Sequence, residues 1–175
     1  MDEKKIILEI QNLSVSFQQY DKGFGRTDLD VIRDLNVTIH EGEMVAVVGS
    51  SGSGKSLLAH GILGILPYNS VLGGTILYDG EELTQKRKEE LRGNEIVLVP
   101  QSVAFLDPLM KIGPQIRKGK KDSESKKKLD GIFEGYHLKR EVQELYPFEL
   151  SGGMNRRVLV STAMMGNPRL VIADE

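Results

Sequence analysis

The sequence predicts an α/β fold, and two observations carry this prediction. Continuous apolar runs of the kind found in buried parallel strands lie at 44–48, 96–99 and 170–173, with helix-compatible stretches between them. In addition, Gly49 to Ser56 read Gly-Ser-Ser-Gly-Ser-Gly-Lys-Ser, a glycine-rich turn between one of these runs and a helix-compatible stretch. Strand, turn and helix therefore follow one another as an α/β core requires.

Composition excludes several classes of protein. The chain has 175 residues, a formal net charge of −2 and no cysteine. Its length allows one core with a small insertion, and the absence of cysteine excludes disulfides and cysteine-based zinc sites. No apolar run approaches the roughly 18 residues of a membrane-spanning helix, and the charged N-terminus lacks the apolar stretch of a secretory signal. We expect a soluble, cytosolic protein whose role at a membrane, if it has one, is peripheral.

The N-terminal half predicts strands at 6–10, 13–17 and 31–40, with a polar loop at 18–30 between the second and the third. A turn at 41–43 should lead into a further strand at 44–48. After the glycine-rich turn, the pattern predicts a helix from about Lys55 to Leu63, which Gly64 and Pro67 should end.

The C-terminal half predicts a strand at 73–80 that closes on an Asp-Gly turn, and partly helical structure at 81–92. Buried strands should follow at 96–99 and 170–173, and the spacing of Leu129, Ile132 and Phe133 predicts a helix. The run 117–128 is mainly basic, but it is short for a nucleic-acid patch and has no aromatic residues. It is more typical of a solvated helix face or a connector.

The turn at 49–56 matches the phosphate-loop template G-x-x-x-x-G-K-S/T at every fixed position. Glycine residues let the backbone approach a ligand closely, and the N–H groups at the start of a helix attract an anion. Lys55 can then reach the terminal phosphates, and the Ser56 hydroxyl can coordinate Mg²⁺. The whole loop is the predicted nucleotide site: Gly49, Ser50, Ser51, Gly52, Ser53, Gly54, Lys55 and Ser56. A chance match of a Gly/Ser-rich turn is the alternative.

Two further motifs narrow the chemistry. Ser151-Gly152-Gly153 stands directly before a helix-compatible stretch and offers a second anion site, although such a tripeptide is more often a plain helix cap. Asp174 and Glu175 follow the apolar run 170–173. At the end of a buried strand an Asp can hold the Mg²⁺ shell and an adjacent Glu can polarise water, whereas an exposed strand end would carry ordinary acidic residues.

The three motifs in this order closely resemble the ATP-binding cassette (ABC) ATPases. Within that family, Phe105-Leu106-Asp107-Pro108 and the segment 146–154, with Met154 where most cassettes have Gln, are similar to the importers of oligopeptides, dipeptides or nickel. The resemblance covers essentially the whole chain. It implies a P-loop NTPase core with a mainly parallel sheet, an N-terminal antiparallel β subdomain and an inserted α-helical subdomain. The expected domain is a single cassette over 1–175, incomplete at its C-terminal end, with the helical insertion at 102–155.

The resemblance also implies residue roles and partners. Gln101 matches the Q-loop glutamine, so Glu175, Gln101 and Lys55 are the expected catalytic residues, and Ser56, Gln101 and Asp174 the expected Mg²⁺ ligands. ATP would be held between the phosphate loop of one cassette and Ser151, Gly152 and Gly153 of a second cassette. The expected function is the ATP-binding and hydrolysing subunit of an importer. Its other partners would be transmembrane permease subunits and, indirectly, an extracytoplasmic substrate-binding protein. Nucleic acid is not an expected partner. The protein would lie in the cytoplasm, peripherally on the inner face of the membrane.

Two features depart from the family pattern. The aromatic residue that stacks on adenine is replaced at its aligned position by about Leu29, although Tyr20 and Phe24 lie nearby. No histidine follows Glu175, so the sequence looks like a truncated cassette. We expect it to bind nucleotide and make no prediction for hydrolysis by this chain alone. A soluble cassette protein acting in DNA repair or on ribosomes, and an inactive truncated cassette, are the alternative functions.

Overall fold

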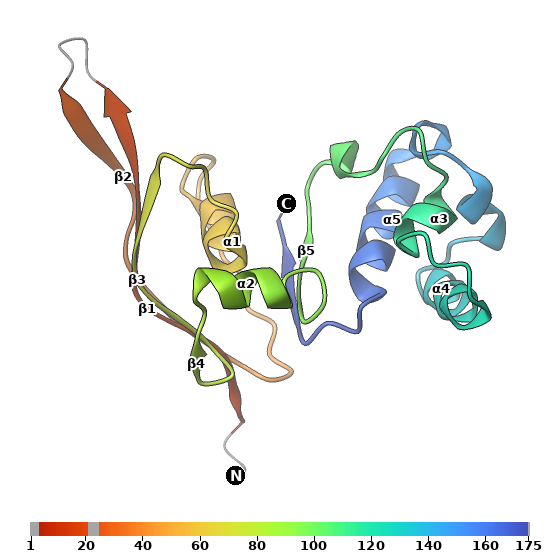
Figure 1. Ribbon diagram of the computed structural model, residues 1–175, viewed down its shortest axis with the longest axis horizontal. Coiled ribbons are helices and arrows are strands. Elements are labelled where there is room, and N and C mark those ends of the chain that lie inside the picture. The colour runs from red at the N-terminus through yellow and green to blue at the C-terminus, as the bar shows by residue number, and fades with distance from the viewer. Residues whose placement is uncertain (1–3, 21–24, 175) are drawn as a thin grey trace. The chain divides into compact units, whose positions relative to one another are not determined.

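The computed structural model describes residues 4–20 and 25–174, and at Tyr20 and Arg26 only the backbone. The chain divides into two compact units, Met1–Arg92 and Gly93–Glu175, which are described separately below. Figure 1 labels the helices α1 to α5 and the strands β1 to β5. Within the described ranges, no helix is long and apolar enough to cross a membrane.

The first unit is built on an antiparallel sheet with the strand order β2-β1-β3-β4. Its elements are β1 (Ile6–Tyr20), β2 (Arg26–His40), α1 (Lys55–Leu63), β3 (Ser70–Tyr78), β4 (Glu81–Glu82) and α2 (Gln85–Leu91). Alternating side chains of β1 are buried, with Leu13 and Val15 fully enclosed, because one face of an antiparallel sheet packs on the core. The predicted N-terminal antiparallel subdomain is therefore present.

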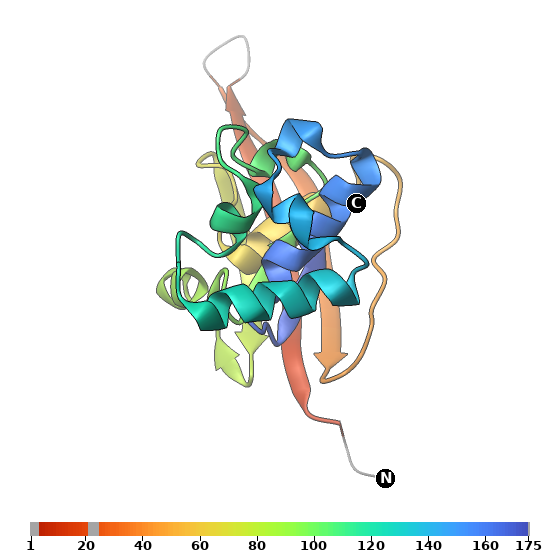
Figure 2. The same cartoon turned by 90° about the vertical axis from the view of Figure 1, so that its right-hand side faces the viewer.

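The second unit combines a two-stranded parallel sheet with helices. Its elements are β5 (Ile96–Val99), η1 (Val103–Phe105), α3 (Ile112–Ile116), α4 (Ser123–Gly135), η2 (Arg140–Glu144), η3 (Pro147–Glu149), α5 (Gly152–Met164) and β6 (Leu170–Ala173), where η marks a 3-10 helix. Strands β5 and β6 pair in parallel, with Val99 opposite Ala173. Helices α4 and α5 lie against each other (Figure 2).

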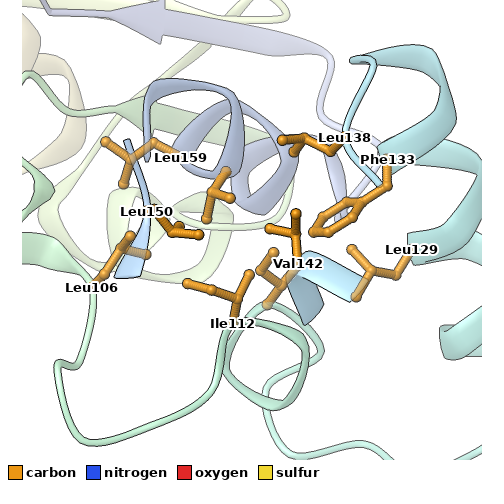
Figure 3. Close-up of a cluster of buried hydrophobic side chains, with 10 residues drawn as sticks. Leu106, Ile112, Leu129, Phe133, Leu138, Val142, Leu150 and Leu159 are labelled. Carbon is orange, nitrogen blue, oxygen red and sulfur yellow. The ribbon is translucent and has the colours of Figure 1, made fainter. Parts of the chain in front are cut away.

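The core of the second unit is a cluster of ten buried apolar side chains (Figure 3). Leu129 and Phe133 of α4 meet Val158 and Leu159 of α5 there, and all of these side chains are almost completely buried. Burial of a Leu or Phe side chain contributes about 1.5–3 kcal/mol, so this cluster holds α5 along its length. The predicted helical spacing of Leu129, Ile132 and Phe133 is confirmed by α4.

Several predicted elements agree with the structure. Helix α1 spans Lys55–Leu63 and ends at Gly64, which has the left-handed φ of 67° that the stop signal requires. Strand β3 closes on the turn Asp79-Gly80, where both residues have positive φ. Strands β5 and β6 match the apolar runs 96–99 and 170–173.

The predicted strand at 44–48 is wrong. The structure assigns no strand there, and Met44 and Val48 are 97% and 89% exposed. An apolar run becomes a strand only when its backbone N–H and C=O groups find a neighbouring strand. In the described part of the first unit, β1 pairs with β2 and β3, and no strand pairs with 44–48.

The predicted loop at 18–30 is also wrong at both of its ends. Strand β1 continues to Tyr20 and β2 begins at Arg26, with Gln18 opposite Asp28. The sequence lacks apolar alternation here because these strand ends are exposed, and backbone pairing with the neighbouring strand maintains the extended conformation. The two strands predicted at 6–10 and 13–17 form one strand, which is interrupted by a register shift near Asn12, where φ is 50°.

Candidate functional site

The phosphate loop has the backbone that its glycines predict. Gly52 and Gly54 have φ angles of 79° and 91°, in the left-handed region that other residues rarely adopt. A Cβ at Gly49 would stand 2.6 Å from the Ser53 hydroxyl oxygen, so this position accepts no side chain without a rearrangement. The loop from Gly49 to Ser53 is exposed and leads directly into α1.

Lys55 lies over this loop. Its Nζ donates hydrogen bonds to the carbonyl oxygens of Gly49 and Ser50, both at 2.8 Å, and lies 3.5 Å from the Ser53 hydroxyl. An ammonium group has three donors, so the loop itself supplies acceptors for the whole charge. The side chain is thereby held at the centre of the loop, where a bound phosphate chain would meet it.

Helix α1 is held at its far end by side chains of α2. The Lys88 ammonium donates to the Gly61 carbonyl at 2.7 Å, Arg92 donates to Leu63 O at 3.1 Å, and Gln85 donates to Gly64 O at 3.2 Å. These carbonyls lie in the last turn of α1 and at its C-cap, where a helix leaves its acceptors without partners and carries its negative pole. Helix α2 therefore caps the helix that carries the phosphate loop.

Lys88 is the buried member of this cap, with 5% of its surface exposed. Burial lowers its pKa from the usual value, and the nearby Glu82 carboxylate acts in the opposite direction. Motif reasoning missed this group. The spacing of Gln85, Lys88 and Arg92 was the available signal, since residues separated by three and four positions lie on one face of a helix.

A hollow of about 290 Å³ lies beside the loop. Val31, Ile32 and Leu35 of β2 line it together with Val48 and Lys55. Leu29, the residue aligned with the adenine-stacking position, pairs with Phe17 in the sheet and is 52% exposed. Phe24 lies outside the described residues, as does the side chain of Tyr20, so adenine stacking stays unassigned.

The Ser-Gly-Gly turn begins α5 as a capped helix. The Ser151 hydroxyl accepts a hydrogen bond from the Met154 N–H at 3.3 Å, which is the N-cap arrangement. Gly152 and Gly153 are exposed, and a Cβ on either would contact nothing within 4 Å. Arg157 connects this first turn to the end of α4, because it donates to Gly153 O at 3.1 Å and to His137 O at 3.0 Å.

Gln101 and Asp174 lie at one edge of the parallel sheet. Strand β5 ends at Val99 and β6 at Ala173, these two residues are paired, and the Asp174 N–H donates to Val99 O at 3.0 Å. Gln101 follows β5 by two residues and Asp174 follows β6 directly, so both stand at the carboxyl end of their strands. Glu175 lies outside the described residues.

The predicted site residues therefore form three groups. The eight residues from Gly49 to Ser56 share one loop in the first unit. In the second unit, Ser151, Gly152 and Gly153 start α5, while Gln101 and Asp174 share an edge of the β5–β6 sheet. The amide and carboxylate oxygens of that edge and the hydroxyl of Ser56 are hard oxygen donors of the type that Mg²⁺ prefers.

Comparisons with known proteins agree with this arrangement. Residues 32–175 match the family model described as "ABC transporter". The oligopeptide transport ATP-binding protein OppD of Salmonella typhimurium is 34% identical over 97% of this chain and 53% of its own length. OppD of Bacillus subtilis is 32% identical over 97% of this chain and 50% of its own length. The chain thus spans about half the length of the curated relatives it matches.

Solved structures support the fold. CbiO1 from Clostridium perfringens, described as part of the ABC transporter complex cbiONQ, gives a TM-score of 0.75 at 24% identity, over 99% of this chain and 66% of its own. A bacterial ABC transporter cassette solved as a dimer gives a TM-score of 0.78 at 24% identity, over 97% of this chain and 74% of its own. The predicted P-loop NTPase fold is confirmed by these neighbours.

Proposed function

The chain belongs to the ABC transporter family, and we propose that it is the ATP-binding and hydrolysing part of an importer of peptides. The observation that carries this proposal is the loop 49–56, in which left-handed glycines lead into α1 and Lys55 stands over the loop. This geometry suits a phosphate chain, because helix N–H groups and an ammonium surround one small volume. The match to two oligopeptide transport ATP-binding proteins supports peptides as the substrate class.

The loop residues bind and orient the phosphates in this proposal. Lys55 exchanges the carbonyl oxygens of Gly49 and Ser50 for oxygens of the terminal phosphates, and the charged contact offsets the lost hydrogen bonds. The N–H groups at the start of α1 point toward the same anion. Helix α2 keeps α1 in position through its hydrogen bonds to the opposite end.

The residues that would hold Mg²⁺ are Ser56, Gln101 and Asp174. When bound, the ion neutralises charge on the phosphates and helps to align the reacting groups. Gln101 and Glu175 orient the attacking water, and Glu175 accepts its proton. Asp174 belongs to this group because it follows β6 at the edge it shares with Gln101.

The second half of the ATP site comes from another cassette. Ser151, Gly152 and Gly153 of one chain face the phosphate loop of its partner, and their exposure leaves them accessible for this contact. Closure of the two cassettes around ATP and reopening after hydrolysis would move transmembrane permease subunits. The protein would then lie at the inner face of the membrane, and an extracytoplasmic binding protein would deliver the peptide.

The first experiment measures ATP affinity of the 175-residue chain by calorimetry. Lys55→Ala should weaken binding by about 100-fold or more, since it removes the only ammonium held at the loop among the described residues. Lys86→Ala is the matched control, because Lys86 is exposed on α2 away from the loop. Equal affinity of Lys55→Ala and the unchanged chain would contradict the proposal.

A second experiment tests the composite site by mixing. Neither Lys55→Ala nor Ser151→Arg should form an ATP-dependent dimer alone, as judged by size-exclusion chromatography. Their mixture should form one, because one of its two sites then combines an intact phosphate loop with an intact Ser-Gly-Gly turn. Purification with two permease subunits would support transport, whereas purification with ribosomes or DNA would contradict it.

A further inference from the structure

The basic run 117–128 lines a cavity in the second unit. The cavity has a volume of about 540 Å³ and lies among the turn 117–120, the first turn of α4, the end of α5 and the turn at Gly93-Asn94. Four basic side chains of the run line it: Arg117, Lys118, Lys120 and Lys128. Composition alone suggested a solvated helix face or a connector. The structure adds that four basic side chains of the run line a cavity.

The positive charge of this cavity is only partly offset. In the part of the chain that the structure describes, no ion pair involves any of the four basic side chains. By contrast, Lys5, Arg87 and Lys111 each contact a carboxylate. Like charges around one cavity repel each other, and an anion placed among them offsets that repulsion.

The two acidic residues of the lining offset only part of this charge. The Asp122 carboxylate accepts a hydrogen bond from the Ser125 N–H at 2.7 Å as the N-cap of α4, and this bond lowers the pKa of Asp122. Its charge therefore serves the helix. Glu124 is exposed in the first turn of α4, which leaves four cations against two anions around the cavity.

The turn that presents the lysines has a defined shape. Lys118 and Gly119 both have positive φ, and the Gly119 N–H donates to Pro114 O at 2.9 Å. Arg117 Nη1 donates to Lys120 O at 2.7 Å, and Lys118 Nζ lies 3.4 Å from Gly93 O at the cavity wall. Arg117, Lys118 and Lys120 thus project from a hydrogen-bonded turn and Lys128 from α4, which lowers the entropic cost of gathering them around a ligand.

We infer that this cavity binds a small oligophosphate, either inorganic or the phosphate chain of a nucleotide. A volume of 540 Å³ lies within the roughly 300–1,000 Å³ of small-molecule pockets. Two or more linked phosphates carry enough negative charge to contact several of the four cations at once, and lysine and arginine are the usual partners of phosphate oxygens. An extended nucleic acid or a membrane surface would contact the exposed lysines of the whole run, and would not depend on those around the cavity.

The experiment uses pyrophosphate as the probe and the Lys55→Ala chain as the background, which removes the phosphate loop as a competing site. The test variant Lys118→Glu/Lys120→Glu reverses two charges of the cavity lining. The matched control Lys126→Glu/Lys127→Glu reverses two charges of the same run, at exposed positions that do not line the cavity. Calorimetry at about 0.15 M salt gives the affinities, and circular dichroism checks the fold of each variant.

The test variant should lose roughly tenfold or more in pyrophosphate affinity, while the control changes by less than about twofold. ADP that binds the background chain as tightly as pyrophosphate does would show that the phosphates alone are recognised. Equal losses in the two double variants would overturn the inference, because binding would then follow the charge of the run. Binding to an oligonucleotide or to anionic vesicles that falls equally in both variants would assign the run to a macromolecule and would also overturn it. These outcomes do not depend on the proposed ATP site, which is tested through Lys55 and Ser151.

Discussion

Helices α1 and α5 both begin at a glycine-containing turn, yet they are stabilised in different ways. Helix α5 starts with Ser151, whose hydroxyl caps the Met154 N–H, and its body packs into the apolar cluster of the second unit. Helix α1 starts with Gly54, which has no side chain with which to cap. Its hydrogen-bonded cap lies at the other end, where side chains of α2 and Arg92 bind its last carbonyls, and its apolar face, with Leu58 and Ile62, is buried. A helix that must present its N-terminus to an anion obtains its stability elsewhere.

The largest expected effect comes from one substitution made in both turns. Gly54→Ala should lower the free energy of unfolding by about 2–4 kcal/mol, because φ is 91° there and the new Cβ would stand 3.0 Å from Ile32. Gly153→Ala should raise it by about 0.5 kcal/mol, since the position is helical and open. Urea unfolding followed by circular dichroism measures both, and a loss of similar size at Gly153 would mean that the two turns are alike.

The next effect tests the cap at the end of α1. Lys88→Met should lower the free energy of unfolding by about 1–3 kcal/mol, because the Gly61 carbonyl then lacks its buried donor. Lys86→Met, at an exposed position two residues away on the same helix, is the control and should change stability by less than about 0.5 kcal/mol. If both variants had the same stability, α1 would not depend on α2.

A smaller effect is expected at the start of α5. Ser151→Ala should cost about 1 kcal/mol by removing the cap, and Ser151→Asp should restore most of it, because Asp caps equally well. Thermal unfolding measures the cap. ATP-dependent dimer formation measures the proposed contact with the partner, and it should fail in Ser151→Asp because a carboxylate repels phosphates. If Ser151→Asp forms a dimer at the same ATP concentration as the unchanged chain, Ser151 acts only as a helix cap and does not contact the nucleotide.

The smallest expected effect is a pH dependence of the stability that Lys88 of α2 gives to the end of α1. Burial lowers the pKa of Lys88 in the folded chain, so between that value and 10.5 the unfolded chain binds more protons. The contribution of Lys88 to stability therefore rises as the pH increases through this range. The unfolding free energy of the unchanged chain minus that of Lys88→Met should therefore be larger at about pH 10 than at pH 7. A difference that does not vary with pH would contradict a buried, titrating Lys88.

Features that depend on neighbours in the sequence were predictable. The bounds of α1 follow from Lys55 and Gly64, and the turn at Asp79-Gly80 follows from residues that tolerate positive φ. The phosphate loop and the cap at Ser151 are also local, because their hydrogen bonds close within a few residues. The basic run 117–128 was visible in the sequence, but nothing in it indicated that four of its side chains would surround a cavity.

The strand predictions were wrong where pairing with a neighbouring strand, and not the local pattern of apolar residues, decided the backbone conformation. The apolar run 44–48 looks more like a strand than 26–30 does, yet among the described residues only the latter has a neighbouring strand in a ladder, at the end of β1. Exposed strand ends need no apolar alternation, and an apolar run without a paired neighbour leaves its backbone groups without a ladder. The sequence pattern reports which side chains are apolar and contains no direct record of which strands meet.

The sequence by itself determined the phosphate loop, the turn at Ser151 and the limits of α1, because steric restrictions at glycine and capping hydrogen bonds act over a few residues. Only the tertiary structure decided that Lys88 is buried beneath the last turn of α1, that Gln101 and Asp174 share an edge, and that the lysines near 117–128 gather around a cavity. These features join segments distant in sequence, and burial and pairing between such segments arise only when the chain is packed.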